Sequence, residues 1–152
     1  MSFEQDTVSR LETNLDDLSP EIIGALMDRL FEAGALDVWF TPIHMKKNRP
    51  GTMVSLLCPP ALQQAMADLL FRETSAFGVR IETIQRLKLA RRFETVQTPF
   101  GPITVKLGLK GDAVVQVAPE FDSCNAAARR HTVPVRTVFQ SALTAFDARR
   151  PV

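Results

Sequence analysis

The 152-residue sequence predicts an α+β protein made of two consecutive parts. In the first part, strand-like and helical stretches follow one another in the order β-α-β-β-α-β, which is the signature of a ferredoxin-like split βαβ half. The second part opens with a hairpin pattern around Pro99-Phe100-Gly101-Pro102 and closes with two helical stretches. We therefore predict a ferredoxin-like subdomain over residues 8–90. A smaller β-hairpin and helix subdomain, packed on the first, is expected over residues 91–150.

The first strand and helix are marked by their residue types. Residues 8–15 carry apolar positions among polar ones and read as a strand. Ser19 is a good N-cap, and Pro20 suits the first helical position. Apolar residues then recur at helical spacing as far as Gly34, which is a natural stop.

The rest of the first part follows from apolar runs and turn residues. Residues 36–45 and 52–57 are the next two strands, and Pro59-Pro60 opens the second helix. That helix ends between residues 74 and 78, and residues 79–89 resume strand character.

The second part contains short strands and then helices. The predicted elements are strands 93–98, 103–109 and 114–117, followed by helices 121–131 and 134–148.

Composition limits the classes of function. The net charge is +1, so there is no global basic field that would favour binding to nucleic acid. No apolar run approaches the 18 residues or so that a membrane span needs. The two cysteines, without a CxxC pair or a secretory leader, favour a reducing, cytoplasmic setting. Neither a P-loop nor a GxGxxG motif is present.

A basic run joins the second and third predicted strands. Lys46, Lys47, Asn48 and Arg49 stand directly before Pro50-Gly51, which supplies the turn residues. A turn does not require three cations and an amide. Arginine offers a planar fork and lysine a mobile charge, so the run suits an anionic ligand, above all phosphates. A solvated hairpin tip is the competing interpretation.

An acidic run lies where the first strand meets its helix. Glu12 and Asn14 share one face of the strand, and Asp16 joins them if the strand persists; Asp17 follows. Several oxygen ligands near a helix start suit Mg²⁺ or Mn²⁺. Helix capping and solvation are the simpler explanation of the two aspartates, because acids are common at helix starts. Whether the acidic and basic runs converge depends on strand ends that the sequence does not settle.

Other cations and the cysteines have less specific interpretations. Arg72 lies at the end of the second helix, where the helix dipole favours a cation, and it can form a surface ion pair there. Arg80, Arg86, Lys88, Arg91 and Arg92 form a basic stretch that a solvated face explains, although the two parts can also use it to grip a phosphate. Cys124 at a helix start favours a thiolate, but a buried, inert cysteine is the simpler account.

In their order along the chain, these motifs resemble the C-terminal domain of the LarC family. The resemblance covers about residues 9 to 140 and includes the distinctive run Met45-Lys46-Lys47-Asn48-Arg49-Pro50-Gly51-Thr52. Its other segments are LETNLDD (11–17), SPE (19–21), GALDV (34–38), RET (72–74), GVR (78–80), RLKL (86–89), FGP (100–102), VK (105–106) and PEFDSC (119–124).

The resemblance implies a CTP-dependent cyclometallase, a lyase that inserts nickel into pyridinium-3,5-bisthiocarboxylic acid mononucleotide to mature the nickel-pincer cofactor of lactate racemase. It implies that this domain binds CTP with Mn²⁺ or Mg²⁺ and forms a homo-oligomer, a trimer or hexamer. Carried onto this sequence, the resemblance implies two sets of candidate residues. The phosphate-binding candidates are Lys46, Lys47, Asn48, Arg49, Arg72 and Arg80. The metal-binding candidates are Glu12, Asn14, Asp16 and Asp17.

Two departures from the family pattern affect the expected function. The family's N-terminal domain is absent from this chain, so complete turnover is expected to need it as a partner. Ser75-Ala76-Phe77 replaces the family's small polar run before Gly78. The alternative function is a non-catalytic, oligomerising ferredoxin-like domain that senses a small anion.

Overall fold

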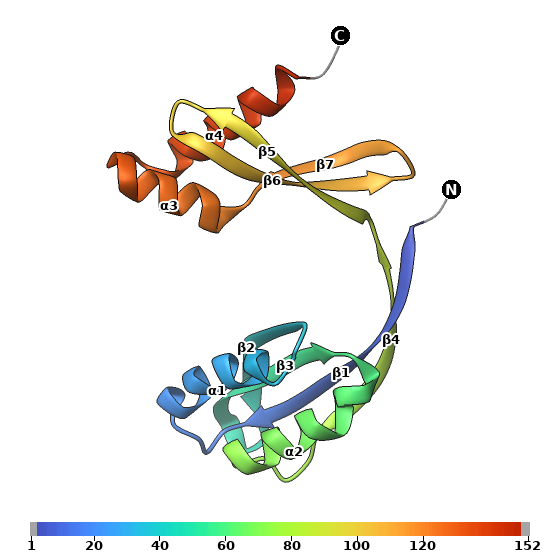
Figure 1. The fold of residues 1–152 in the computed structure, drawn as a ribbon. Coiled ribbons are helices and arrows are strands. Elements are labelled where there is room, and N and C mark those ends of the chain that lie inside the picture. Colours follow the sequence, from blue (N-terminus) through green and yellow to red (C-terminus); the bar gives the residue numbers. More distant parts are fainter. Residues whose placement is uncertain (1–2, 150–152) are drawn as a thin grey trace. The chain divides into compact units, whose positions relative to one another are not determined.

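The computed structural model describes residues 3–149 and divides into two compact units (Figure 1). One unit contains residues 5–86. The other contains residues 87–149 together with Phe3 and Glu4. The domain boundaries predicted from the sequence, and the packing of one part on the other, stay predictions.

The first unit has the predicted order of elements. They are β1 (Glu4–Leu15), α1 (Pro20–Glu32), β2 (Asp37–Met45), β3 (Arg49–Cys58), α2 (Gln63–Glu73) and β4 (Arg80–Lys88), with short 3₁₀ turns η1 (Lys46–Asn48) and η2 (Pro60–Leu62). The strands form one sheet in the order β2-β3-β1-β4. β3 is antiparallel to both of its neighbours. The sheet therefore has β1 and β3 at its centre, as a ferredoxin-like half requires.

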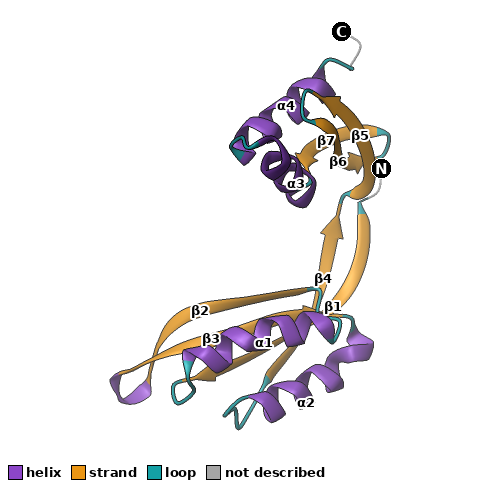
Figure 2. Cartoon of the chain, turned by 60° about the vertical axis from the view of Figure 1, so that its left-hand side comes forward, coloured by secondary structure: helices purple, strands orange, loops and turns teal. Residues whose placement is uncertain are grey.

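One face of this sheet and the two helices form the core of the first unit. Leu11 and Leu15 of β1 and Val54 and Leu56 of β3 point to that face and are buried. Helix α1 adds Ile23, Leu26 and Leu30, and α2 adds Met66, Leu69 and Leu70. Since side chains alternate along a strand, Glu12 and Asn14 point to the other face. Figure 2 shows the two helices beside the sheet.

The helix boundaries agree with the residues that predicted them. The Ser19 hydroxyl oxygen accepts a hydrogen bond from the Glu21 backbone N–H at 3.3 Å, which caps α1. Gly34 has a φ of +101°, a left-handed conformation that glycine adopts without a steric penalty. The chain can therefore turn sharply there from α1 into β2.

The second unit has a three-stranded sheet with two helices on one face (Figure 1). Its elements are β5 (Ala90–Thr98), β6 (Gly101–Lys110), β7 (Ala113–Pro119), α3 (Phe121–His131) and α4 (Val135–Asp147). β6 lies between β5 and β7, so the predicted hairpin is extended by a third strand. Val96, Ile103, Val105 and Leu107 pack against α3 and α4.

Both cysteines are part of these cores. Cys58 lies at the end of β3 and Cys124 in the first turn of α3, and both side chains are fully buried. Burial raises the pKa of both thiols. The buried, inert interpretation of Cys124 therefore holds, and its position at a helix start does not make it a thiolate. Among residues 3–149, no helix has the length and apolar character needed to cross a membrane.

Candidate functional site

The basic run forms a tight, exposed turn between β2 and β3. Lys47 and Asn48 have φ values of 60° and 58°. For a non-glycine residue this left-handed conformation costs roughly 1–2 kcal/mol. The Asn48 Oδ1 and His44 Nε2 atoms lie 2.6 Å apart and support the turn. The side chains of Lys46 and Lys47 form no ion pair within residues 3–149, so both ammonium groups are available to a ligand.

The glycine of this run brings the turn against the end of β1. Gly51 follows the turn on β3, and Leu15 lies opposite Thr52 in the β1–β3 pairing. A Cβ atom on Gly51 would lie 2.7 Å from the Leu15 carbonyl oxygen and 2.7 Å from the Met45 sulfur. Only a residue without a side chain permits so close an approach.

The acidic and basic runs therefore converge, which the sequence left open. Arg49 Nη1 lies 3.3 Å from Asp16 Oδ2 and joins the start of β3 to the segment after β1. Asn14, at the end of β1, and Lys46 also line one hollow of 460 Å³, together with Ile43, His44 and Met45. The two runs thus share a concave surface at one end of the sheet.

Arg80 joins the last strand to this surface. Its guanidinium donates a hydrogen bond to Asn14 Oδ1 at 2.8 Å and lies 3.7 Å from a Glu12 carboxylate oxygen. The Ser55 hydroxyl donates to the other Glu12 oxygen at 3.2 Å, and Arg10 lies 3.7 Å from it. Glu12 is consequently held on the open face of the sheet by side chains of its own strand and of both neighbouring strands, β3 and β4.

Two predicted residues lie apart from this group. Arg72 is at the end of α2, on the helical side of the sheet. It forms an ion pair with Glu73 at 3.0 Å and is otherwise exposed. Asp17 accepts a hydrogen bond from the Ser75 hydroxyl at the start of the loop between α2 and β4. The structure thus brings together Glu12, Asn14, Asp16, Lys46, Lys47, Asn48, Arg49 and Arg80.

The oxygen ligands fit a divalent ion only together with ligands from outside the chain. Within residues 3–149, no three His, Cys, Asp or Glu side chains lie where they could share a metal ion. Glu12 and Asp16 are also each paired with an arginine. Mg²⁺ is usually bound by one or two carboxylates together with waters and substrate phosphates. The group therefore suits an ion that arrives with a phosphorylated ligand.

Ser55 and Arg10 were not among the residues singled out from the sequence. Ser55 is fully buried although it lies on the open face, because the neighbouring side chains cover it. The sequence signal that could have singled out Ser55 is its place between Val54 and Leu56 on a strand. It places a hydroxyl in an otherwise apolar strand opposite Glu12 in the β1–β3 pairing.

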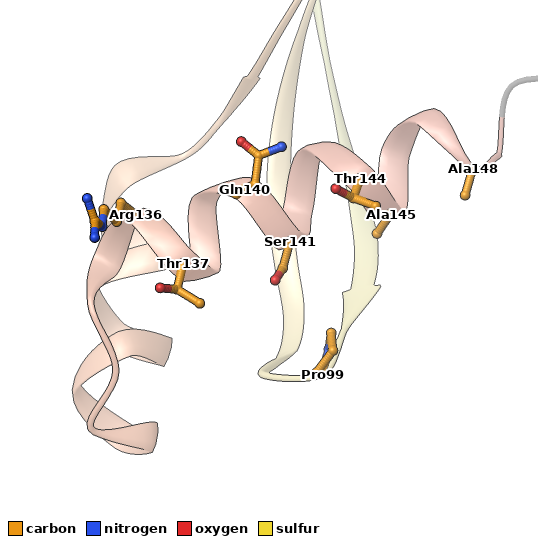
Figure 3. A pocket seen from close by; sticks show the side chains of 8 residues that line it. All are labelled: Pro99, Arg136, Thr137, Gln140, Ser141, Thr144, Ala145 and Ala148. Carbon is orange, nitrogen blue, oxygen red and sulfur yellow. The ribbon is translucent and has the colours of Figure 1, made fainter.

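A different hollow, of 700 Å³, lies along helix α4 in the second unit (Figure 3). Thr137, Gln140, Ser141 and Thr144 line it from the helix, and Pro99 lines it from the turn between β5 and β6. None of the predicted site residues lines this hollow, and Arg136 is the one cation among its lining residues. We therefore place the candidate site at the β2–β3 turn.

Comparison with known proteins decides the family. The sequence model of the nickel insertion protein family matches residues 1–139. This chain belongs to that family. A putative nickel insertion protein from Syntrophotalea carbinolica is 43% identical over 145 residues, which are 95% of this chain and 37% of that protein.

Other relatives agree with this assignment. The pyridinium-3,5-bisthiocarboxylic acid mononucleotide nickel insertion protein of a Thermotoga species is 41% identical over 131 residues, 86% of this chain and 33% of its own length. The chain thus spans about a third of the length of these relatives.

A solved structure shares both the fold and the sequence pattern. It is the apo form of LarC2, described as the C-terminal domain of a cyclometallase involved in synthesis of the NPN cofactor of lactate racemase. It superposes with a TM-score of 0.91 at 41% identity, over 95% of this chain and 99% of that one. A protein from Methanopyrus kandleri superposes with a TM-score of 0.67 at 26% identity.

Proposed function

We propose that this chain is the nucleotide-binding part of an enzyme that inserts nickel into pyridinium-3,5-bisthiocarboxylic acid mononucleotide. In this proposal it binds CTP with Mn²⁺ or Mg²⁺ at the β2–β3 turn, and a separate N-terminal domain completes the enzyme. Nickel is a substrate of the reaction, which belongs to the lyase class. The family assignment supports nickel insertion. The convergence of the basic turn with the acidic strand end is the observation that supports a nucleotide site.

The roles of the residues follow from their present contacts. Lys46 and Lys47 are exposed and form no ion pair with any residue from 3 to 149, so they can bind a triphosphate without losing a partner there. Arg49 already pairs with Asp16 at 3.3 Å, so a phosphate that binds its guanidinium competes with the Asp16 carboxylate. Once Arg49 turns to the phosphate, the Asp16 carboxylate is free to accept a cation.

Glu12, Asn14 and Asp16 are the residues that would hold the divalent ion, with Asp17 as a further candidate. The ion would neutralise part of the triphosphate charge and supply a Lewis acid beside the scissile phosphates. Arg80 holds Asn14 by a hydrogen bond of 2.8 Å, so it fixes the position of the amide oxygen before the ligand arrives. Its guanidinium, like that of Arg49, can also turn to phosphate. The protein is proposed to act in the cytoplasm as a homo-oligomer, a trimer or hexamer.

Calorimetric titration of CTP into the chain, with Mn²⁺ or with EDTA, tests the proposal. We expect binding that requires the metal and that is weaker for the other nucleoside triphosphates. Trp39, the single tryptophan, lies opposite Ser55 in the β2–β3 pairing and supplies a fluorescence signal near the site.

A matched pair of variants locates the site. Removing two charge-assisted phosphate contacts in Lys46→Ala/Lys47→Ala should weaken CTP binding by about 100-fold. Arg129→Ala/Arg130→Ala removes two exposed cations from the last turn of α3 and should leave the affinity unchanged. Equal effects of the two variants, or CTP binding that is as tight in EDTA, would refute the nucleotide site. Binding that survives chelation is what the anion-sensing alternative predicts.

A further inference from the structure

The open face of the three-stranded sheet holds a second basic hollow. Two cross-strand rows lie on this face, Arg91–Gly108–Gln116 and Phe93–Lys106–Ala118. The alternate positions of β6, Ile103, Val105 and Leu107, point to α3 and α4 and are buried. The helices of this unit therefore pack on the opposite side and leave the two rows uncovered.

This hollow has a volume of 300 Å³, an apolar floor and a basic rim. The floor includes Leu89 and Ala118, and Lys88, Arg91 and Lys106 supply the rim, with Gln116 beside them. Gly108 makes the depression possible. A Cβ atom there would lie 2.7 Å from the Leu89 side chain and 3.0 Å from Gln116 Cβ. A larger residue would therefore displace the floor.

Two of the three rim cations have acidic neighbours. Lys106 pairs with Glu120 at 3.2 Å, and Lys88 lies 4.0 Å from Glu4. Arg91 has no hydrogen-bond or ion-pair partner within residues 3–149. A guanidinium that is planar, always charged and unpaired suits a carboxylate or phosphate, which it can bind through two parallel hydrogen bonds.

The phenyl ring of Phe93 adds an aromatic surface to the same face. It is 58% exposed and lies opposite Lys106 in the β5–β6 pairing, two residues along the strand from Arg91. A positively charged heterocycle is attracted to the face of a phenyl ring. Few ligands combine a flat cationic ring with several anionic groups, and a pyridinium mononucleotide with carboxylate-type substituents is one of them.

We propose that this hollow binds the pyridinium mononucleotide substrate, with its ring on the apolar floor and facing Phe93, and its phosphate or carboxylate groups on Arg91 and Lys106. The proposal rests on the proposed function for the identity of the substrate and on the geometry of this unit for the place. It assigns to the chain a substrate site separate from the β2–β3 turn.

Nicotinate mononucleotide is a suitable probe, since it has a pyridinium ring, a carboxylate and a phosphate. Calorimetric titration into the full chain should show binding that Arg91→Gln weakens by at least about tenfold. Arg92→Gln is the matched control. Arg92 is the next residue and also exposed, but it points to the other side of β5, where it pairs with Glu94 at 2.9 Å. This control should bind like the unmodified chain.

Further arms separate this site from the nucleotide site. Inorganic phosphate and nicotinate should each bind more weakly than the mononucleotide. The Lys46→Ala/Lys47→Ala variant should still bind the mononucleotide. This expectation holds even if the unmodified chain does not bind CTP. The inference is overturned if the mononucleotide does not bind, if the Arg91 and Arg92 variants behave alike, or if CTP competes for the hollow with equal affinity in the Lys46→Ala/Lys47→Ala background.

Discussion

The same glycine-to-alanine change should have opposite effects at two positions of the first unit. Gly51→Ala places a methyl group 2.7 Å from the Leu15 carbonyl oxygen and 2.7 Å from the Met45 sulfur. The thioether can move, but the backbone oxygen belongs to the paired central strands β1 and β3. At Gly24, within α1, no heavy atom lies within 4 Å of the corresponding Cβ position, apart from its chain neighbours and the backbone of its own helix.

The expected magnitudes follow from these surroundings. Overpacking against a fixed backbone costs about 1–3 kcal/mol, so Gly51→Ala should lower the free energy of unfolding by that amount. Alanine in a helix interior is favoured over glycine by about 1 kcal/mol, so Gly24→Ala should raise it. The two variants should therefore differ by roughly 2–4 kcal/mol.

Urea denaturation followed by tryptophan fluorescence measures this difference. Trp39 is the only tryptophan and lies on β2, so the signal reports the first unit. Because Gly51 also holds the basic turn against β1, Gly51→Ala should weaken CTP binding, and Gly24→Ala should not. A neutral or stabilising Gly51→Ala would show that β3 does not approach the Leu15 carbonyl oxygen so closely. A destabilising Gly24→Ala would contradict the open surroundings assigned to Gly24.

Three further predictions concern caps, thiols and ion pairs. Ser19→Ala removes the cap of α1 and should lower the free energy of unfolding by about 1 kcal/mol in urea denaturation, whereas Ser19→Asp should largely retain it. Burial raises the pKa of Cys58 and Cys124 above 9.0, so the unfolded thiols lose their protons first as pH rises. Stability from this source is present below pH 9.0 and lost above it, so a double Cys→Ala variant should show a smaller loss between about pH 8 and pH 10. Arg86 donates two hydrogen bonds to Asp6, of 3.0 and 2.7 Å, which raise the pKa of Arg86. Arg86→Gln should cost about 1 kcal/mol or less, with a smaller cost at high salt; a cost that is independent of salt would contradict an ion-pair role.

The sequence predicted the order of elements because that information is local. Ser19, Pro20 and Gly34 bound α1 through caps and backbone preferences that act within a few residues. The central position of β1 and β3 followed from the βαββαβ order, since that order admits few sheet arrangements.

The strand ends were less predictable. β3 begins at Arg49 instead of residue 52, because Arg49 and Pro50 pair with Met45 and His44 although they read as turn residues. β1 begins at Glu4 instead of residue 8. In both places polar residues continue a strand, so hydrophobic alternation does not mark the strand end.

The convergence of the candidate site depends on those same strand ends. The contact between Asp16 and Arg49 requires the register in which Leu15 lies opposite Thr52. Register is set by pairing between strands far apart in the sequence, so no local pattern contains it. A sequence motif can also include a residue that lies outside the site. Arg72 is part of a family motif, yet it lies on the helical side of the sheet and pairs with Glu73.

In each unit, one sheet face is covered by two helices and the other carries the charges. The covered faces hold the buried side chains on which stability depends, such as Leu11 and Leu107. The turn at the end of the sheet carries Lys46 in one unit, and the open face carries Arg91 in the other; neither residue has an internal partner within residues 3–149. Substitutions on the open faces should therefore change ligand binding with little change in stability. The glycines at 51 and 108 are the exception, because each allows a close approach below a proposed site and so links binding to packing.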